Sequence, residues 1–111
     1  MEFRHVDFGF STADADQIEL KFESAALTLR FLDWREQPIV KTFQDVLAFK
    51  WDSVFDESAP RDDQSFEVVD SPWLSREVER REIEDPSQYC HYKLCFNELG
   101  VLDVLALAAK H

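Results

Sequence analysis

The sequence predicts a mainly β protein of the α+β kind, in which an antiparallel sheet bends into a small sandwich or an open barrel. Apolar residues alternate with polar ones in several short segments, which is the period of a strand with one buried face. Short polar turns separate these segments, as antiparallel connections allow. We expect about seven or eight strands and one short helix, in a single domain that covers residues 1–111.

The first half of the chain carries the clearest alternation. Val6, Phe8 and Phe10 alternate with polar residues or glycine and predict a first strand within residues 3–10. Residues 17–23 and 26–34 alternate in the same way, and the short link between them predicts a hairpin, although it lacks the usual Gly or Asn. A helix over residues 14–32 is the competing interpretation, and the apolar period of two argues against it.

The middle of the chain predicts two more short strands, a loop, a further strand and the helix. The strands cover residues 39–43 and 46–51 after a polar turn at 33–38, and residues 52–64, with five acids, read as an exposed loop. Residues 65–70 form the next strand. Ser71 suits a helix N-cap and Pro72 the first helical position, so we expect a helix over residues 72–81.

The last part of the chain, residues 88–107, predicts a second hairpin. Two apolar runs flank residues 97–100, where Asn97 suits the start of a turn and Gly100 suits its close. In the first run, even-numbered residues from Cys90 to Phe96 share one face, and His91, Lys93 and Cys95 share the other, as in a half-buried strand. Residues 105–111 fit either the end of a strand or a terminal helix.

The charge of the chain narrows the classes of partner. There are 23 acidic residues against 12 basic ones, which gives a net charge of −11 spread along the chain. This surface repels phosphate backbones and anionic lipids, so we expect neither nucleic-acid nor membrane binding. A protein partner, and in particular a basic one, would be attracted by the same field. Cys90 and Cys95 point to opposite faces of one predicted strand, so they are not expected to form a bridge, and reduced thiols indicate a cytoplasmic protein.

The sequence predicts no metal, no cofactor and no catalytic residue. The three histidines lack metal-ligand spacing, and two glycines are too few for a phosphate-binding loop. The nearest nucleophilic triplet is Cys95 with His91 and Asp103, but His91 and Cys95 lie four residues apart on one strand, too far apart for a hydrogen bond. An enzyme is therefore the less favoured interpretation.

The tryptophans are the best candidates for a binding surface. Trp34 lies in a predicted turn between Asp33 and Arg35, Trp51 ends a strand and precedes Asp52, and Trp73 begins the helix. A Trp beside acids is typical of a surface that binds a basic protein. The candidate binding residues are Trp34, Trp51, Asp52 and Trp73, with packing as the alternative for each, more strongly for Trp51 and Trp73.

Residues 29–34, 43–49, 91–97 and 100–104 resemble segments of small uncharacterised bacterial proteins. This resemblance implies a bacterial protein and carries over no functional residue. In general character (small, acidic, cytosolic, rich in β structure and aromatic residues) the chain is also similar to immunity proteins of bacterial toxin systems. That likeness implies a toxin domain as the partner.

Together these observations favour a non-enzymatic protein-interaction module with an acidic surface. One alternative is a small-ligand-binding protein or an enzyme with an apolar pocket inside the bent sheet, because ten Phe and three Trp supply enough material to line one. Another alternative is a structural subunit that forms a homodimer through a free sheet edge.

Overall fold

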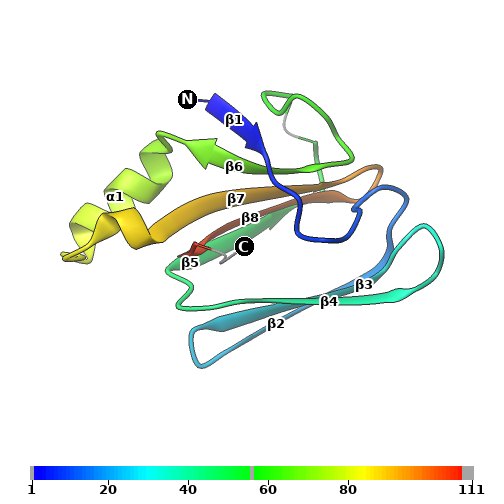
Figure 1. The fold of residues 1–111 in the computed structure, drawn as a ribbon, viewed down its shortest axis with the longest axis horizontal. Coiled ribbons are helices and arrows are strands. Elements are labelled where there is room, and N and C mark those ends of the chain that lie inside the picture. Colours follow the sequence, from blue (N-terminus) through cyan, green and yellow to red (C-terminus); the bar gives the residue numbers. More distant parts are fainter. Residues whose placement is uncertain (1, 56, 109–111) are drawn as a thin grey trace.

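The computed structural model describes residues 2–55 and 57–108, and over these residues eight strands and one α-helix form a two-layer sandwich (Figure 1). The predicted fold class is confirmed. The larger sheet has the strand order β1-β6-β7-β8-β5 and the smaller one β2-β3-β4, with every pairing antiparallel. The strands are β1 (Glu2–His5), β2 (Asp16–Glu23), β3 (Ala26–Leu32), β4 (Pro38–Phe43), β5 (Ala48–Asp52), β6 (Ser65–Val69), β7 (Tyr89–Phe96) and β8 (Gly100–Leu107).

Both predicted hairpins are present. Ser24 and Ala25 turn β2 into β3 with φ values of 51° and 63°, so two non-glycine residues adopt the left-handed conformation that a tight hairpin demands. Gly100 begins β8 with a φ of 152°, and a Cβ atom there would lie 2.5 Å from the carbonyl oxygen of Asp52. The second hairpin therefore requires glycine at this position for both conformation and space.

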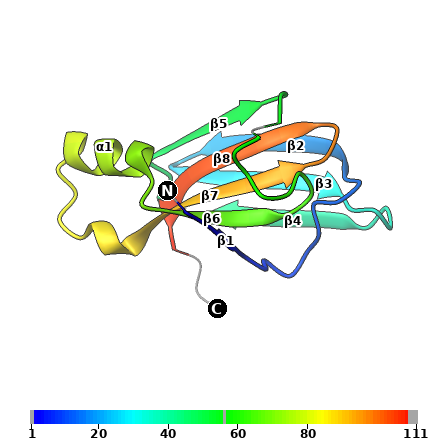
Figure 2. The ribbon, with the colours of Figure 1, turned by 90° about the horizontal axis from the view of Figure 1, so that it is seen from above.

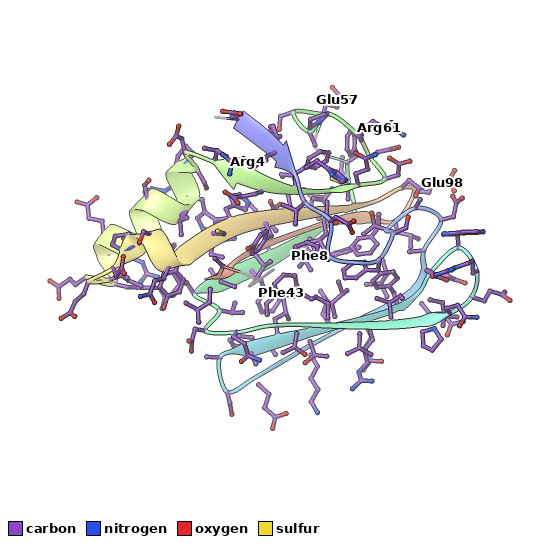
Figure 3. The ribbon with its side chains drawn as sticks, in the orientation of Figure 1. Arg4, Phe8, Phe43, Glu57, Arg61 and Glu98 are labelled. Atoms are coloured by element: carbon purple, nitrogen blue, oxygen red, sulfur yellow. The ribbon has the colours of Figure 1, made fainter. Side chains whose placement is uncertain are left out.

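The main core fills the space between the two sheets. Most of its buried members come from β3, β4, β7 and β8, and include Leu29, Phe31, Phe43, Leu94, Phe96 and Leu102. Phe8 packs edge-on against Phe43, with ring centroids 5.9 Å apart, and both rings lie between the sheets in Figure 3.

The predicted strand at Val6, Phe8 and Phe10 is wrong, because β1 ends at His5 and the chain continues as a loop. The alternation arises because this loop sends its apolar side chains into the core, where Phe10 packs on Phe31 with ring centroids 5.5 Å apart. A loop that closes the end of a sandwich thus shows the same period as a strand.

Helix α1 (Pro72–Arg80) begins where the sequence predicts, with the Ser71 hydroxyl accepting a hydrogen bond from the Leu74 N–H. A short 3₁₀ turn, η1 (Pro86–Gln88), precedes β7. Helix α1 lies at one end of the five-stranded sheet, and the β3–β4 and β7–β8 turns lie at the other (Figures 1 and 2). Within the described residues, no helix combines the length and apolar character that crossing a bilayer requires.

The expectation of a half-buried β7 is wrong, because both of its faces are covered. Tyr92, Leu94 and Phe96 face the main core, whereas Cys95 packs with Phe66 and Val101 in a second cluster on the outer face of the five-stranded sheet. Ala59, from the acidic loop at residues 53–64, completes that cluster. The polar side of the predicted strand is therefore an interior surface.

Candidate functional sites

The end of the sandwich opposite α1 is built from four segments, residues 6–14, 33–37, 61–64 and 97–99, which we call the loop end (Figure 1). Hydrogen bonds tie two of these segments together. The Asp14 N–H donates to the side-chain oxygen of Asn97 over 2.8 Å, and the Asn97 amide donates back to the Asp14 carboxylate over 3.0 Å. Segments 6–14 and 97–99 are therefore held against each other in spite of their irregular backbone.

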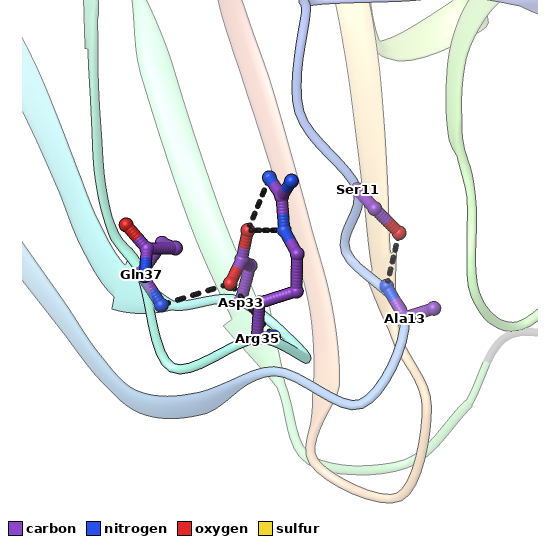
Figure 4. A network of polar contacts seen from close by, with 5 residues as sticks. All are labelled: Ser11, Ala13, Asp33, Arg35 and Gln37. Carbon is purple, nitrogen blue, oxygen red and sulfur yellow. Dashed lines mark hydrogen bonds and ion pairs between the residues drawn. The ribbon is translucent and has the colours of Figure 1, made fainter.

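The turn at residues 33–37 is organised around one buried carboxylate (Figure 4). Asp33 accepts hydrogen bonds from the backbone N–H groups of Arg35 and Gln37, both at 2.9 Å, and from the Arg35 guanidinium at 3.2 Å. Burial alone raises the pKa of Asp33, but the hydrogen bonds from Gln37 and Arg35 and the charge of Arg35 outweigh it, so that the pKa is lowered. The ionised carboxylate thus holds the turn closed.

This turn presents Trp34 to solvent, with 61% of the residue exposed. The Arg35 guanidinium lies 5.4 Å from the centroid of the Trp34 ring, a cation–π distance. Because the backbone on both sides of Trp34 is fixed by Asp33, the ring is displayed from a rigid support.

A cavity of about 300 Å³ opens elsewhere at the loop end, lined by residues from 5–13 and 63–65. Asp7 and Asp63 are among its lining residues, which include no Lys or Arg. Two buried polar atoms of this lining, Thr12 Oγ1 and Asp63 Oδ1, have no hydrogen-bond partner among the described residues. Thr12 is only 2% exposed. Buried polar atoms are rarely left in this state, so this lining is a candidate binding site.

A second polar cluster lies on the outer face of the five-stranded sheet, at the end covered by α1. His91 on β7 accepts or donates at both ring nitrogens: Nδ1 lies 2.7 Å from Ser71 Oγ, and Nε2 lies 2.6 Å from Asp103 Oδ1. The ammonium of Lys93 lies 3.2 Å from Asp103 Oδ2. All four residues are at most 7% exposed. We call this set the Ser71–Lys93 network.

The donors and acceptors of the Ser71–Lys93 network form one directed chain when His91 is neutral. An ionised Asp103 can only accept, so the ring proton of His91 lies on Nε2 and Nδ1 is an acceptor. Ser71 then donates its hydroxyl proton to Nδ1 while it accepts from the Leu74 N–H. Every group in this chain has a hydrogen-bond partner.

The charge of Asp103 is maintained in spite of its position. Burial alone raises the pKa of this carboxyl, but the hydrogen bond from His91 and the positive charge of Lys93 outweigh burial, and the pKa is lowered. Asp103 is therefore an anion at neutral pH, able to orient His91 and to stabilise a positive charge on it.

The network forms part of the lining of a cavity of about 260 Å³, with the Trp73 and Phe3 side chains as apolar walls. The Trp73 ring packs edge-on against His91, with centroids 5.3 Å apart, and the Lys50 ammonium lies 4.6 Å from the centre of the Trp73 ring. A neighbouring cavity of about 290 Å³ shares Lys50, Lys93 and Asp103 and extends to Asp52.

The four residues predicted to bind do not form one site. Trp34 lies at the loop end, whereas Asp52 and Trp73 line the two outer-face cavities. Trp51 packs against the Phe96 ring, with centroids 5.9 Å apart, and remains 36% exposed at the edge of the sandwich. Within the triplet Cys95, His91 and Asp103, His91 and Asp103 form a hydrogen bond. The separation along one strand that argued against a His91–Cys95 hydrogen bond does not affect Asp103, because Asp103 lies on the neighbouring strand β8.

The sequence-based prediction did not include four residues of the two candidate sites: Thr12, Asp63, Ser71 and Lys93. Lys93 could have been predicted from the sequence, because the predicted turn at 97–100 places Lys93 directly opposite Asp103, as the structure shows. Ser71 was identified as a helix cap, but no local pattern indicates that the helix start lies against β7. No signal in the sequence pairs Thr12 with Asp63, because a loop brings them together.

Across the described residues, no group of three or more His, Cys, Asp and Glu side chains is arranged to hold a metal ion. Comparison with known proteins finds no matching family model, no matching curated protein and no matching solved structure.

Proposed function

We propose that this protein is an interaction module that binds a basic protein partner at its loop end. The observation that carries the proposal is the loop-end cavity, in which a carboxylate oxygen of Asp63 and the hydroxyl of Thr12 are buried with no hydrogen-bond partner in the described part of the chain. A buried acceptor of this kind lowers its free energy when a donor arrives, and a cationic donor gives the strongest bond to a carboxylate.

The matching group is an Arg or Lys side chain of the partner. Its positive charge would lie against Asp63 and Asp7, and its N–H groups would reach Asp63 Oδ1 and Thr12 Oγ1. Arg61 already pairs with the other oxygen of Asp63, at 3.3 Å, so the incoming group takes the oxygen that Arg61 leaves.

Trp34, on a separate turn of the loop end, supplies an exposed apolar side chain. Interfaces concentrate their binding energy in a few large side chains near their centre, and Trp is the most enriched type. The turn around Asp33 fixes the backbone before binding, so less conformational entropy is lost when Trp34 is covered.

The net charge of −11 contributes at longer range. It attracts a basic protein before contact and raises the association rate, most strongly at low salt. A toxin domain with a basic surface would be one such partner.

The test uses the immobilised chain to capture proteins from a lysate of the source cells at low and at high salt. We expect capture of a basic protein at low salt and its loss at high salt. Asp63→Asn is compared with Asp62→Asn, an exposed neighbour whose substitution changes the net charge equally. Trp34→Ala is compared with Val40→Ala, which removes another exposed apolar side chain, 55% exposed, on the small sheet.

The proposal requires that Asp63→Asn and Trp34→Ala each weaken binding of the captured protein by at least about tenfold, the size of one lost contact of about 1.4 kcal/mol. The two control variants are expected to bind within about twofold of the unaltered chain. Equal effects of Asp63→Asn and Asp62→Asn would show that binding depends on net charge alone and would contradict a specific site at Asp63. Capture of no protein, or of an acidic one, would contradict the proposal of a basic partner.

The alternative of a pocket inside the sheet has less support. Aromatic and aliphatic side chains fill the space between the two sheets, and the cavities with converging polar groups described above lie at the loop end and on the outer face.

A further inference from the structure

We infer that Ser71 is an acyl-accepting nucleophile, with His91 as its general base and Asp103 as the group that orients the base. The substrate class is a small carboxylic ester that enters the cavity beside Trp73. This activity goes beyond partner binding and involves a different part of the molecule, so either proposal can fail alone.

The first argument is the geometry of the three side chains. A serine hydroxyl 2.7 Å from an imidazole nitrogen, with a carboxylate 2.6 Å from the other nitrogen, is the arrangement that activates serine in hydrolases. In this protein the serine contacts Nδ1 and the aspartate contacts Nε2, the reverse of the common assignment. The roles are preserved, because either nitrogen can take a proton while the other is held by a carboxylate.

The second argument is how the fold presents the hydroxyl. Only two residues, Asp70 and Ser71, separate β6 from α1, and Asp70 has a φ of 57°, so Ser71 stands at a sharp strand-to-helix junction. The backbone N–H groups in the first turn of a helix point toward its N-terminus and lack acceptors within the helix. The Trp73 N–H belongs to this turn, and with the positive end of the helix dipole it can stabilise an oxyanion formed beside Ser71.

The third argument is the space in front of Ser71. The cavity of about 260 Å³ has Ser71, His91 and Asp103 among its lining residues. This volume is just below the range of roughly 300–1,000 Å³ typical of small-molecule sites, which limits the substrate to a small ester.

The reaction follows from these positions. Ser71 Oγ forms a bond to the carbonyl carbon as its proton passes to His91 Nδ1, and the carbonyl electron pair moves onto the oxygen. Collapse of this intermediate breaks the bond to the alkoxy group, which leaves as an alcohol with the proton from His91 and leaves Ser71 acylated. Water then repeats the sequence, releasing the carboxylic acid and restoring Ser71. Asp103 stabilises the imidazolium that forms in each half.

The contacts of Ser71 also cap α1, so the test must separate capping from chemistry. The purified full chain is treated with a fluorophosphonate and, separately, with p-nitrophenyl acetate, and adducts are located by peptide mass spectrometry. The key variant is Ser71→Asn, because Asn caps a helix about as well as Ser but has no hydroxyl. Ser75→Ala, an exposed serine of the same helix, is the matched control.

We expect a single adduct on Ser71 of the unaltered chain and of Ser75→Ala, and none on Ser71→Asn while that variant stays folded by circular dichroism. His91→Gln is expected to slow adduct formation by about 10²–10⁴-fold, the usual contribution of a general base. The inference is overturned if neither reagent modifies Ser71 in the folded chain, if the adduct forms elsewhere, or if His91→Gln reacts at the same rate.

Discussion

The loop end and the Ser71–Lys93 network differ in whether their buried polar groups have hydrogen-bond partners. In the network, each member has its hydrogen-bond partner within the chain, and the carboxylate of Asp103 is held by His91 and Lys93. At the loop end, Thr12 Oγ1 and Asp63 Oδ1 have none among the described residues. A complete network stabilises the fold and can also do chemistry, whereas an incomplete one costs stability until a ligand completes it. The difference makes stability measurements informative about function.

The largest expected effect belongs to Asp103→Asn. This substitution removes the negative charge from the buried side chains of His91 and Lys93, and breaking a buried charged network is expected to lower the free energy of unfolding by about 3–5 kcal/mol. Urea denaturation followed by circular dichroism measures the loss. A loss below about 1 kcal/mol would mean that the network contributes no more than a surface ion pair.

The pH dependence of stability sharpens this prediction. Because the pKa of Asp103 is lower in the folded chain than its ordinary value of 3.8, its contribution is present above that value and is lost as the pH falls through the lowered pKa. The difference in unfolding free energy between the unaltered chain and Asp103→Asn should shrink as the pH falls below about 5. Asp33, Glu77 and Asp85 also have lowered pKa values, but their contributions cancel in this difference.

Thr12→Val is expected to change stability in the opposite direction. Valine has nearly the shape of threonine and removes a buried hydroxyl that has no partner in the described part of the chain, so the unfolding free energy should rise by about 1 kcal/mol. Thermal denaturation measures the change. A gain in stability together with weaker binding of the basic partner would identify Thr12 as part of a binding site, whereas a loss would show that its hydroxyl is satisfied in solution.

The smallest effect on stability is expected for Asp63→Asn. Asn keeps a polar atom at the position of Oδ1, which has no partner among the described residues, and Arg61 on the other oxygen is 59% exposed by side chain, so the unfolding free energy should change by less than about 0.5 kcal/mol. The same denaturation experiment on Asp62→Asn gives the reference. A loss comparable to that of Asp103→Asn would remove the contrast between the two regions.

The sequence predicted the local features of this fold and missed the features that depend on distant segments. Helix α1 with its Ser71 cap and the two hairpins follow from patterns within about twenty residues, and the structure confirms them. The order of the five-stranded sheet, and the elements that cover its outer face, follow from no local pattern. For this reason His91 and Lys93 were expected at a half-exposed surface and are instead buried.

The two candidate regions show the same limit. The turn that displays Trp34 is local, since Asp33 binds N–H groups two and four residues later, and an aspartate at the start of a turn predicts this. The Ser71–Lys93 network joins residues that are 20 and 12 positions apart in the chain. Thr12 and Asp63 meet only because two loops close the same end of the sandwich.

The central β7–β8 hairpin has a neighbouring strand on both sides and side chains covering both faces. In deuterium oxide its amides at Leu94 and Leu102 should therefore exchange last, and only through complete opening of the domain. Exchange at α1 and at the Trp34 turn needs only local openings. A single mass-spectrometric time course would therefore compare the exchange rates at the two candidate sites with the rate of the β7–β8 hairpin.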